Sequence, residues 1–199
     1  MSTTEGPAAL LDRQVAVPRL LPDNDDMLIV AGLAGTARDT AGLCGDQSNY
    51  YALAGAMGGA VAMGLGLALA QPARRVVVIT GDGELLMNVG SLATVAVMNP
   101  PNLAVLCIDN GRYGETGNQQ SHTAFGVDLA GIAQSSGFQT VRTVAEEADL
   151  DEAAALLRGA NGTTFVLCKV GDAPPPKFKR SLDGAYAKSR FRLGLLGHE

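Results

Sequence analysis

The sequence has 199 residues, which is the length of one ordinary domain. Hydrophobic residues make up 47% of it, which excludes a disordered chain, and charged residues make up only 18%, against roughly 25% in an average soluble domain. The formal net charge of −5 and the pI of about 5.0 exclude a general attraction to nucleic-acid phosphates, so we expect no nucleic-acid partner.

The predicted elements alternate between short apolar strands and helices. In chain order, strands are expected at residues 27–31, 49–53, 75–80, 103–108, 139–142 and 163–170, and helices at residues 55–70, 84–98, 128–136 and 149–158. Strands that are apolar throughout and separated by helices are typical of a parallel sheet with helices on both faces. The sequence therefore predicts a single α/β domain.

Both ends of the chain differ in composition from this alternating region. Residues 1–26 contain three prolines and are expected to form an N-terminal arm or docking segment, with the domain itself at residues 27–172. A basic C-terminal tail is expected at residues 173–199, where three consecutive prolines form a stiff spacer. The last 23 residues carry six Lys or Arg against two acids, which fits either a solvated tail or a segment that lies across a partner subunit.

The sequence favours a cytoplasmic protein with no membrane contact. Residues 1–21 lack the basic start and apolar core of a targeting peptide. Residues 52–70 carry no charge, but seven of them are Ala and five are Gly, which suits a closely packed buried helix better than a membrane span. The three cysteines are odd in number and far apart, which indicates a reducing compartment and no metal cluster.

The strand at residues 75–80 ends in the turn Gly81-Asp82-Gly83-Glu84, and a helix is expected to follow. Ligands of parallel sheets bind at the carboxyl ends of strands, where glycines let the backbone approach a phosphate and a helix start offers free N–H groups. A carboxylate at Asp82 would repel a diphosphate unless a divalent cation lay between them. The turn therefore predicts a phosphate site completed by Mg²⁺.

The next apolar strand ends in a second polar turn, which contains Asn110 and Arg112. Asn110 follows Gly83 by 27 positions, one helix and one strand later, so the two turns are expected to be neighbours. The side-chain oxygen of Asn110 and the main-chain oxygen of Arg112 are suitable ligands for the same cation.

Together these turns resemble the signature of thiamine diphosphate enzymes, specifically their diphosphate-binding domain. The resemblance runs from about Met27 to the end of the sheet and is closest to the β subunits of sulfopyruvate decarboxylases and to phosphonopyruvate decarboxylases. It rests on GAMG at residues 55–58, GDGELLMNVGSLATVAVMNPPNL at residues 81–103 and IDNGRYGETGNQQSH at residues 108–122. It implies that Asp82, Asn110 and the Arg112 carbonyl bind Mg²⁺, and that the backbone around Gly81, Gly83 and Glu84 binds the diphosphate.

The same resemblance implies a second cofactor element at Gly55 and Met57. The Gly55 carbonyl would bind the aminopyrimidine edge, and Met57 would wedge the cofactor into a bent shape that places its imino nitrogen beside the reactive thiazolium carbon. Without the turn at Asp82, the simpler interpretation of Met57 would be ordinary helix core.

A glycine-rich loop after the Asn110 turn is expected to cover the cofactor and to contact the substrate. The candidate substrate contacts are Tyr113, Thr116, Asn118, Gln119 and His122, and the resemblance also implies that Tyr113 and Gly114 bind the cofactor. His122 is the candidate acid or donor to a substrate carboxylate, although a loop histidine with a structural hydrogen bond is an alternative. Gln120 stands where a proline often follows in the close family, which bears on the loop conformation and the substrate.

Thiamine enzymes of this kind use a Glu on a separate pyrimidine-binding domain to activate the cofactor. A chain of 199 residues leaves no room for a second α/β domain, so we expect this Glu on a separate α subunit, in a hetero-oligomer of α2β2 or larger form. The resemblance thus implies the β subunit of a two-component decarboxylase of a small 2-oxo acid. Carboligation as in acetolactate synthases, an oxidative 2-oxo acid enzyme, and a non-catalytic scaffold subunit are the alternatives.

Overall fold

The computed structural model describes residues 10–53, 55–159, 162–178 and 183–197. Within these residues a six-stranded sheet has the order β2-β1-β3-β4-β8-β7, and every neighbouring pair is parallel. The strands are β1 (Leu28–Ala31), β2 (Tyr50–Ala52), β3 (Val76–Gly81), β4 (Leu103–Asp109), β7 (Thr140–Val144) and β8 (Thr164–Lys169). The parallel α/β prediction is confirmed.

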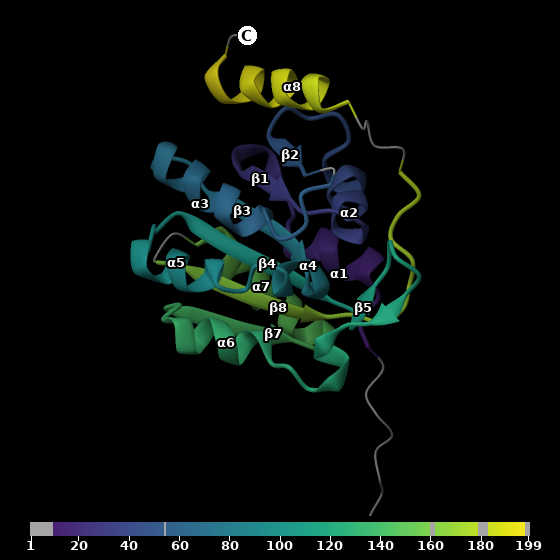
Figure 1. Cartoon of the computed structure of the whole chain (residues 1–199). Coiled ribbons are helices and arrows are strands. Elements are labelled where there is room, and N and C mark those ends of the chain that lie inside the picture. Colours follow the sequence, from purple (N-terminus) through teal and green to yellow (C-terminus); the bar gives the residue numbers. More distant parts are fainter. Residues whose placement is uncertain (1–9, 54, 160–161, 179–182, 198–199) are drawn as a thin grey trace, which may run out of the picture.

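Helices cover both faces of the sheet (Figure 1). One face packs against α1 (Arg13–Leu20), α2 (Gly35–Cys44) and α7 (Leu150–Arg158), and the other against α3 (Ala60–Ala70), α5 (Ser91–Met98) and α6 (Leu129–Ser136). Successive side chains of a strand point to opposite faces, so β4 alternates between the two cores: Leu106 and Ile108 face α1 and α7, whereas Val105 and Cys107 face α5 and α6. Because β1, β3 and β4 are parallel neighbours, their carboxyl ends lie side by side at the same end of the sheet.

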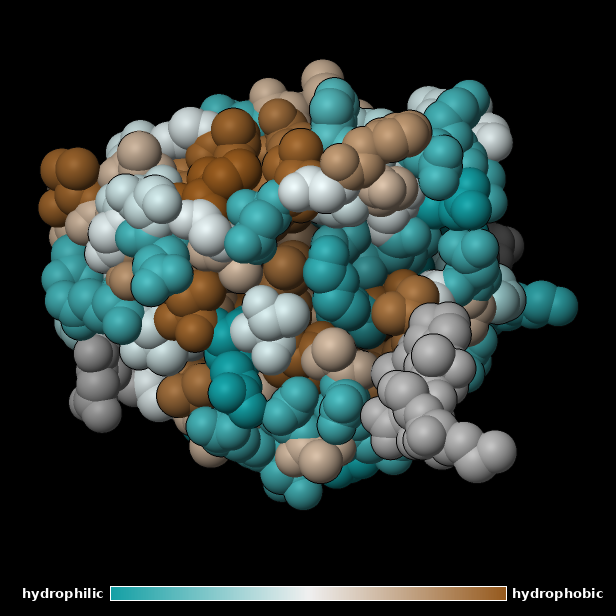
Figure 2. Space-filling model, turned by 90° about the horizontal axis from the view of Figure 1, so that it is seen from below, coloured by the Kyte–Doolittle hydropathy of each residue, from teal (hydrophilic) through white to brown (hydrophobic). Residues whose placement is uncertain are grey.

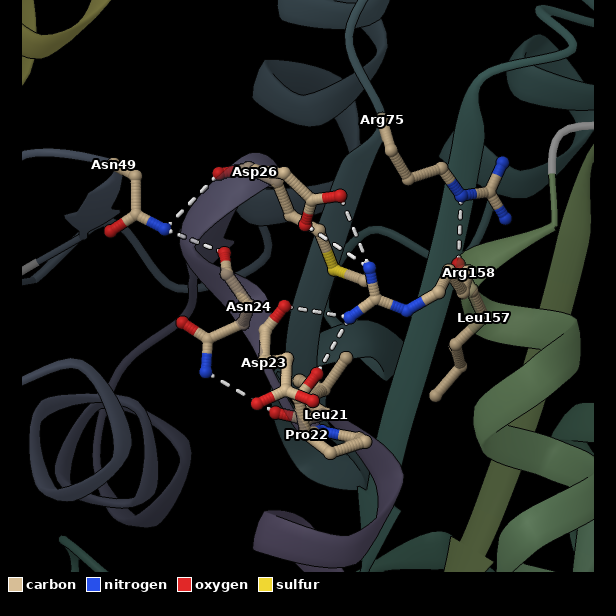
Figure 3. Close-up of polar contacts among 10 residues, drawn as sticks. Leu21, Pro22, Asp23, Asn24, Asp26, Asn49, Arg75, Leu157 and Arg158 are labelled. Carbon is tan, nitrogen blue, oxygen red and sulfur yellow. Dashed lines mark hydrogen bonds and ion pairs between the residues drawn. The ribbon is translucent and has the colours of Figure 1, made fainter.

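The described part of the expected N-terminal arm is integrated into the domain. Val17 and Leu20 of α1 are each 1% exposed and pack in the core that α7 shares. Figure 3 shows the guanidinium of Arg158, just at the end of α7, bound to the loop that follows α1. It donates to the carbonyls of Pro22 and Asp23 at 2.6 and 2.7 Å. The described part of this segment therefore packs as a layer of the domain.

Several helices differ from the sequence prediction, and α3 begins at Ala60 rather than at the expected residue 55. Helix α2 was not predicted, because its mixed small and polar residues give no clear apolar stripe. The helix expected at residues 84–98 is two helices, α4 (Asp82–Leu86) and α5, joined by a turn at residues 87–90. There Asn88 donates its side-chain amide to the Gly58 carbonyl and accepts from Ser91 through its own carbonyl, which breaks the helix.

The described residues near the C-terminus include a helix, α8 (Gly184–Leu196), which was not predicted from the sequence. Figure 1 shows this helix above β2, at the edge of the sheet. Phe191 is 7% exposed and contacts the ring of Tyr51 in β2, with 5.8 Å between ring centroids. Arg190 donates to the Tyr50 carbonyl at 3.2 Å and pairs with Asp46 at 3.0 Å. The described tail therefore docks on its own chain rather than extending into solvent.

The outer surface mixes apolar and polar side chains. Figure 2 shows one face, on which apolar residues lie in patches between hydrophilic ones. No helix among the described residues is long and apolar enough to cross a membrane. Cys44, Cys107 and Cys168 are all buried and unpaired, and burial raises the pKa of Cys44 and of Cys168 to about 12.

Candidate functional site

A cavity of about 350 Å³ lies at the edge of the sheet where β1, β3 and β4 end. Its walls include most of the residues that the sequence analysis selected: Met57, Gly81, Asp82, Gly83, Glu84, Asn110, Arg112, Tyr113, Gly114, Thr116 and Asn118. Such an edge is where parallel α/β sheets bind ligands. The two turns, distant in sequence, do meet in one place.

Asp82 begins α4 directly after β3 and is 2% exposed. Its Oδ2 atom accepts hydrogen bonds from the hydroxyl of Ser121 and from that of Thr123, the latter at 3.1 Å. Burial raises the pKa of Asp82 above its ordinary value, and the hydrogen bond from Ser121 opposes this rise. The carboxylate is therefore held in one orientation from the loop side, in a setting where a bound cation would favour its ionised form.

The second turn is tightly closed around Gly111. The side-chain oxygen of Asn110 accepts from the Arg112 N–H at 3.2 Å, and that of Asp109 accepts from the Gly111 N–H at 3.0 Å. Gly111 has a φ of +65°, a conformation that most residues with a side chain avoid. Arg112 and Tyr113 then form the short strand β5 (Arg112–Tyr113), which pairs with β6 (Gln119–Gln120). This hairpin fixes one wall of the cavity.

Glu84 turns its carboxylate away from the loop and into the protein. Its Oε2 atom accepts from the Thr80 hydroxyl at 3.1 Å and from the Leu33 N–H at 3.3 Å, whereas Oε1 is buried without a hydrogen-bond partner in the described structure. Burial raises the pKa of Glu84, and the hydrogen bond from Thr80 opposes this rise. The Glu84 carboxylate is therefore bound to β3 and to the segment after β1 rather than to the loop that holds Asp82.

Gly83 lies against the ring of Tyr113. A methyl group at residue 83 would overlap that ring, so only glycine allows this approach of the two turns. Met57 also lines the cavity and is 39% exposed, before the start of α3. It is therefore not ordinary helix core. Gly55 does not line the cavity, and its carbonyl accepts from the Met57 N–H at 3.2 Å.

His122 lies in the loop that holds Asp82 but is exposed and does not line the cavity. Its Nδ1 atom is 3.4 Å from the hydroxyl of Tyr113, which does line it. Gln119 is likewise outside the cavity and exchanges hydrogen bonds of 2.9 Å with Thr116. The structure brings the histidine to the rim, next to a cavity residue, rather than to the centre.

Several cavity residues were missed by the sequence analysis. They are Arg13, Leu33, Ala34, Gly35, Thr36, Arg38, Ile108, Glu115, Asp172, Ala173, Pro174 and Pro175. Arg13 reaches the cavity from α1 and forms a buried ion pair with Asp39, 2.5 Å between Nη2 and Oδ2. The prolines form part of the rim, held by a hydrogen bond of 2.8 Å from Gln14 to the Pro174 carbonyl. The prolines gave a sequence signal that was interpreted as a spacer, and Ile108 and Glu115 lie in the segment at residues 108–122 that carries the family resemblance.

The described residues fit the expected cofactor and metal. Asp82, Asn110 and the Arg112 carbonyl are oxygen donors of the kind that Mg²⁺ prefers, and they line one cavity. Among the described residues no group of three or more His, Cys, Asp and Glu is arranged to hold a metal ion. A metal site here would therefore use amide and main-chain oxygens beside one carboxylate, which leaves coordination positions for phosphate oxygens.

Known proteins match this chain over most of its length. Residues 42–168 match the family described as thiamine pyrophosphate enzyme, C-terminal TPP binding domain; thiamine pyrophosphate is another name for thiamine diphosphate. The sulfopyruvate decarboxylase subunit beta of Methanothermobacter thermautotrophicus is 37% identical over 169 residues, which are 84% of this chain and 87% of that protein.

Two longer proteins match through part of their length. The phosphonopyruvate decarboxylase of Streptomyces viridochromogenes is 37% identical over 159 residues, which are 80% of this chain but 40% of that protein. A putative thiamin diphosphate-dependent enzyme from Mycobacterium smegmatis has the same fold, with a TM-score of 0.64 and 22% identity, over 85% of this chain and 32% of that one.

Proposed function

The chain belongs to the thiamine pyrophosphate enzyme family, through the family's C-terminal cofactor-binding domain, and from this premise we propose that it is the β subunit of a two-component 2-oxo acid decarboxylase. The proposed substrates are sulfopyruvate, phosphonopyruvate or a similar small 2-oxo acid. The observation that carries the proposal is the match to a separate decarboxylase β subunit over 84% of this chain and 87% of that subunit.

Thiamine diphosphate, when bound, supplies the electron sink that cleavage of the bond to the carboxyl group of a 2-oxo acid requires. This chain's own residues would bind and orient it. Asp82, Asn110 and the Arg112 carbonyl would hold Mg²⁺, and the main-chain N–H groups of Gly83 and Glu84 would face the diphosphate. Met57 would support the bent shape of the cofactor from the cavity wall.

We assign the donor position toward the substrate to His122 and Tyr113. The 3.4 Å separation between the Tyr113 hydroxyl and His122 Nδ1 allows a proton on one group to be shared with the other. Tyr113 lines the cavity and His122 lies at its rim, so a substrate carboxylate at the cavity mouth would be within reach of both. A structural histidine would instead leave the pH dependence of turnover unchanged when replaced by Gln.

The second half of the active site would come from a separate α subunit with a pyrimidine-binding domain and the activating Glu. The described residues contain a single large sheet, which would provide the diphosphate half. Met57 and Met87 flank Gly58 and are 39% and 62% exposed, and Met57 lines the cavity. Exposed, flexible methionines beside a cavity suit a protein contact. We propose an α2β2 or larger complex.

A catalytic decarboxylase subunit is favoured over a scaffold, a carboligating enzyme and an oxidative enzyme. A scaffold subunit has no need of the buried Asp82, the Asn110 turn and the close approach of Tyr113 to Gly83, so we favour catalysis. Decarboxylation is favoured over carboligation or oxidation because both named relatives described above are decarboxylases. A cytoplasmic location is supported by three buried, unpaired cysteines.

The direct test is CO₂ release from sulfopyruvate and phosphonopyruvate with thiamine diphosphate and Mg²⁺. The chain is assayed alone and then with the α subunit added, with pyruvate as a third substrate and acetolactate as a measured product. We expect activity only in the mixture. Full activity of the purified chain alone would contradict the divided site, and acetolactate as the main product would favour carboligation.

A further inference from the structure

An ion pair between a half-buried lysine and a buried carboxylate lies next to the turn that contains Asn110 and Arg112. Asp109 and Lys169 are register partners on the neighbouring parallel strands β4 and β8, and Lys169 Nζ is 2.5 Å from Asp109 Oδ2. The Asp109 side chain is 2% exposed and that of Lys169 is 33% exposed. Neither residue is among the expected metal ligands, yet Asp109 immediately precedes Asn110.

The second carboxylate oxygen of Asp109 holds two separate segments. Asp109 Oδ1 accepts from the Gly111 N–H at 3.0 Å and from the Thr123 hydroxyl at 2.7 Å. The first bond shapes the turn that presents the Asn110 side chain and the Arg112 carbonyl. The second bond fixes the loop that follows β6.

That loop is also attached to Asp82. Thr123 Oγ1 is 3.1 Å from Asp82 Oδ2 and 2.9 Å from the hydroxyl of Ser121, which itself donates to Asp82. The two metal-binding turns therefore do not depend only on their own strands. Both are connected to the single carboxylate of Asp109, one through a main-chain N–H and the other through Thr123.

Resting on the proposed function, we propose that Lys169 and Asp109 are positioning residues that set the distance between Asp82 and the Asn110–Arg112 turn for Mg²⁺. Asp82 and Asp109 are buried carboxylates close enough for both to contact the Thr123 hydroxyl. Because both carry negative charge, they repel one another. The ammonium group of Lys169 offsets the charge of Asp109 and lets it stay in place as an acceptor. Partners of metal ligands commonly change metal affinity by about 10–100-fold when they are lost.

The sign of the change in metal affinity on removal of Lys169 distinguishes a positioning role from a purely electrostatic one. Lys169 is a positive charge near a cation site, so its removal would strengthen metal binding if charge alone mattered. If Lys169 positions the ligands, its removal weakens binding, because Asp109 loses its fixed orientation and the turn at Gly111 is no longer held. The two roles thus predict opposite signs.

The test uses the full chain co-purified with its α subunit and measures binding of Mn²⁺, as a spectroscopic substitute for Mg²⁺, in the presence of thiamine diphosphate. Electron paramagnetic resonance gives the free Mn²⁺ concentration. The variants are Lys169→Met, Lys169→Arg and Asp109→Asn. Arg142→Met is the matched control, because Arg142 on the adjacent strand β7 forms a similarly exposed ion pair with Asp149 at 2.9 Å, away from the cavity.

We expect Lys169→Met and Asp109→Asn to weaken Mn²⁺ binding by about 10-fold or more, Lys169→Arg to restore much of it, and Arg142→Met to leave it unchanged. Thermal unfolding of the metal-free proteins is measured as well. A substitution that only destabilises the fold would lower the melting temperature without changing the Mn²⁺ affinity of the folded fraction. Unchanged or tighter binding by Lys169→Met would overturn the inference.

An Asp82→Asn variant separates this inference from the proposed function. If Mn²⁺ binds to the wild type and not to Asp82→Asn, the metal site stands, and the Lys169 variants then decide the positioning role. If the wild type binds no Mn²⁺ that depends on Asp82, the proposed function fails and the positioning role fails with it.

Discussion

The carboxylate of Glu84 lies directly against the α-carbon of Gly32, so that a methyl group at residue 32 would overlap it. Glu84 comes from the turn that ends β3, and Gly32 follows the end of β1. The same carboxylate accepts from the Thr80 hydroxyl and the Leu33 N–H. One buried side chain thus connects the ends of two neighbouring strands beneath the cavity.

Gly32→Ala is therefore expected to destabilise the chain by about 1–3 kcal/mol, the usual cost of overpacking a closed site. In the Glu84→Ala background the same substitution is expected to cost less, because the overlapping group is gone. Urea unfolding of the two single variants and the double variant measures this coupling. Gly66→Ala is the control: nothing lies within 4 Å of a methyl group there, so a helical alanine should stabilise by up to about 1 kcal/mol. Equal costs of Gly32→Ala in both backgrounds would show that the contact is unimportant.

The buried Glu84 carboxyl also predicts a pH dependence of stability in the metal-free chain. Burial raises its pKa, so the folded state keeps the proton to higher pH than the unfolded state does. The stability that this group contributes is present below the ordinary carboxyl pKa and is lost as the pH rises through the raised value. Glu84→Gln removes this loss, so its stability relative to the wild type should increase from pH 4 toward pH 7. A difference that is constant with pH, measured by chemical unfolding, would contradict the prediction.

Met57→Ala is expected to reduce turnover more than cofactor affinity, because the side chain lines the cavity where the bent cofactor would lie. Its 39% exposure predicts a stability change within about 0.5 kcal/mol. Met63→Ala is a matched control, with 36% exposure on α3 but no place in the cavity wall. Steady-state kinetics and calorimetry of the complete enzyme make the comparison. Equal turnover of the two variants would mean that Met57 has no special role.

Phe191→Ala is expected to release α8 from the edge of the sheet, since a buried phenylalanine contributes about 3–5 kcal/mol. The amide hydrogens of α8 and β2 should then exchange faster, while those of the central strands stay protected. Leu193→Ala is the control, because Leu193 is 48% exposed on the same helix. Unchanged exchange in α8 would mean that the contact between Phe191 and Tyr51 does not hold the helix.

The parts of this molecule that the sequence predicts are those with local signals. Val76–Thr80 is β-branched and apolar, and the glycines around Asp82 mark the end of a strand, so the strand and its turn could be placed without a structure. Asn110 follows by one helix and one strand, and the structure brings it into the cavity with Asp82. The confirmed fold follows from this alternation, and the Mg²⁺ and cofactor assignments remain proposals.

The remaining features depend on contacts between distant residues. Asp109 and Lys169 are 60 positions apart, and nothing in either local sequence indicates that they pair. Helix α8 has a mixed surface, and its apolar side is buried through contacts with the edge of the sheet, such as that between Phe191 and Tyr51. Arg13 and Asp39 likewise meet only when α1 packs on α2. The topology of the fold determines which distant residues pair, and the periodicity of apolar residues in the sequence does not predict it.

The most direct test of the divided active site is a crystal structure of the chain with its α subunit, thiamine diphosphate and Mn²⁺, with anomalous diffraction to locate the metal. We expect a single strong peak bounded by the Asp82 carboxylate, the Asn110 side-chain oxygen and the Arg112 carbonyl, with the diphosphate beside it and the aminopyrimidine against the α subunit. A metal bound elsewhere, or a cofactor held entirely within one of the two chains, would contradict the account.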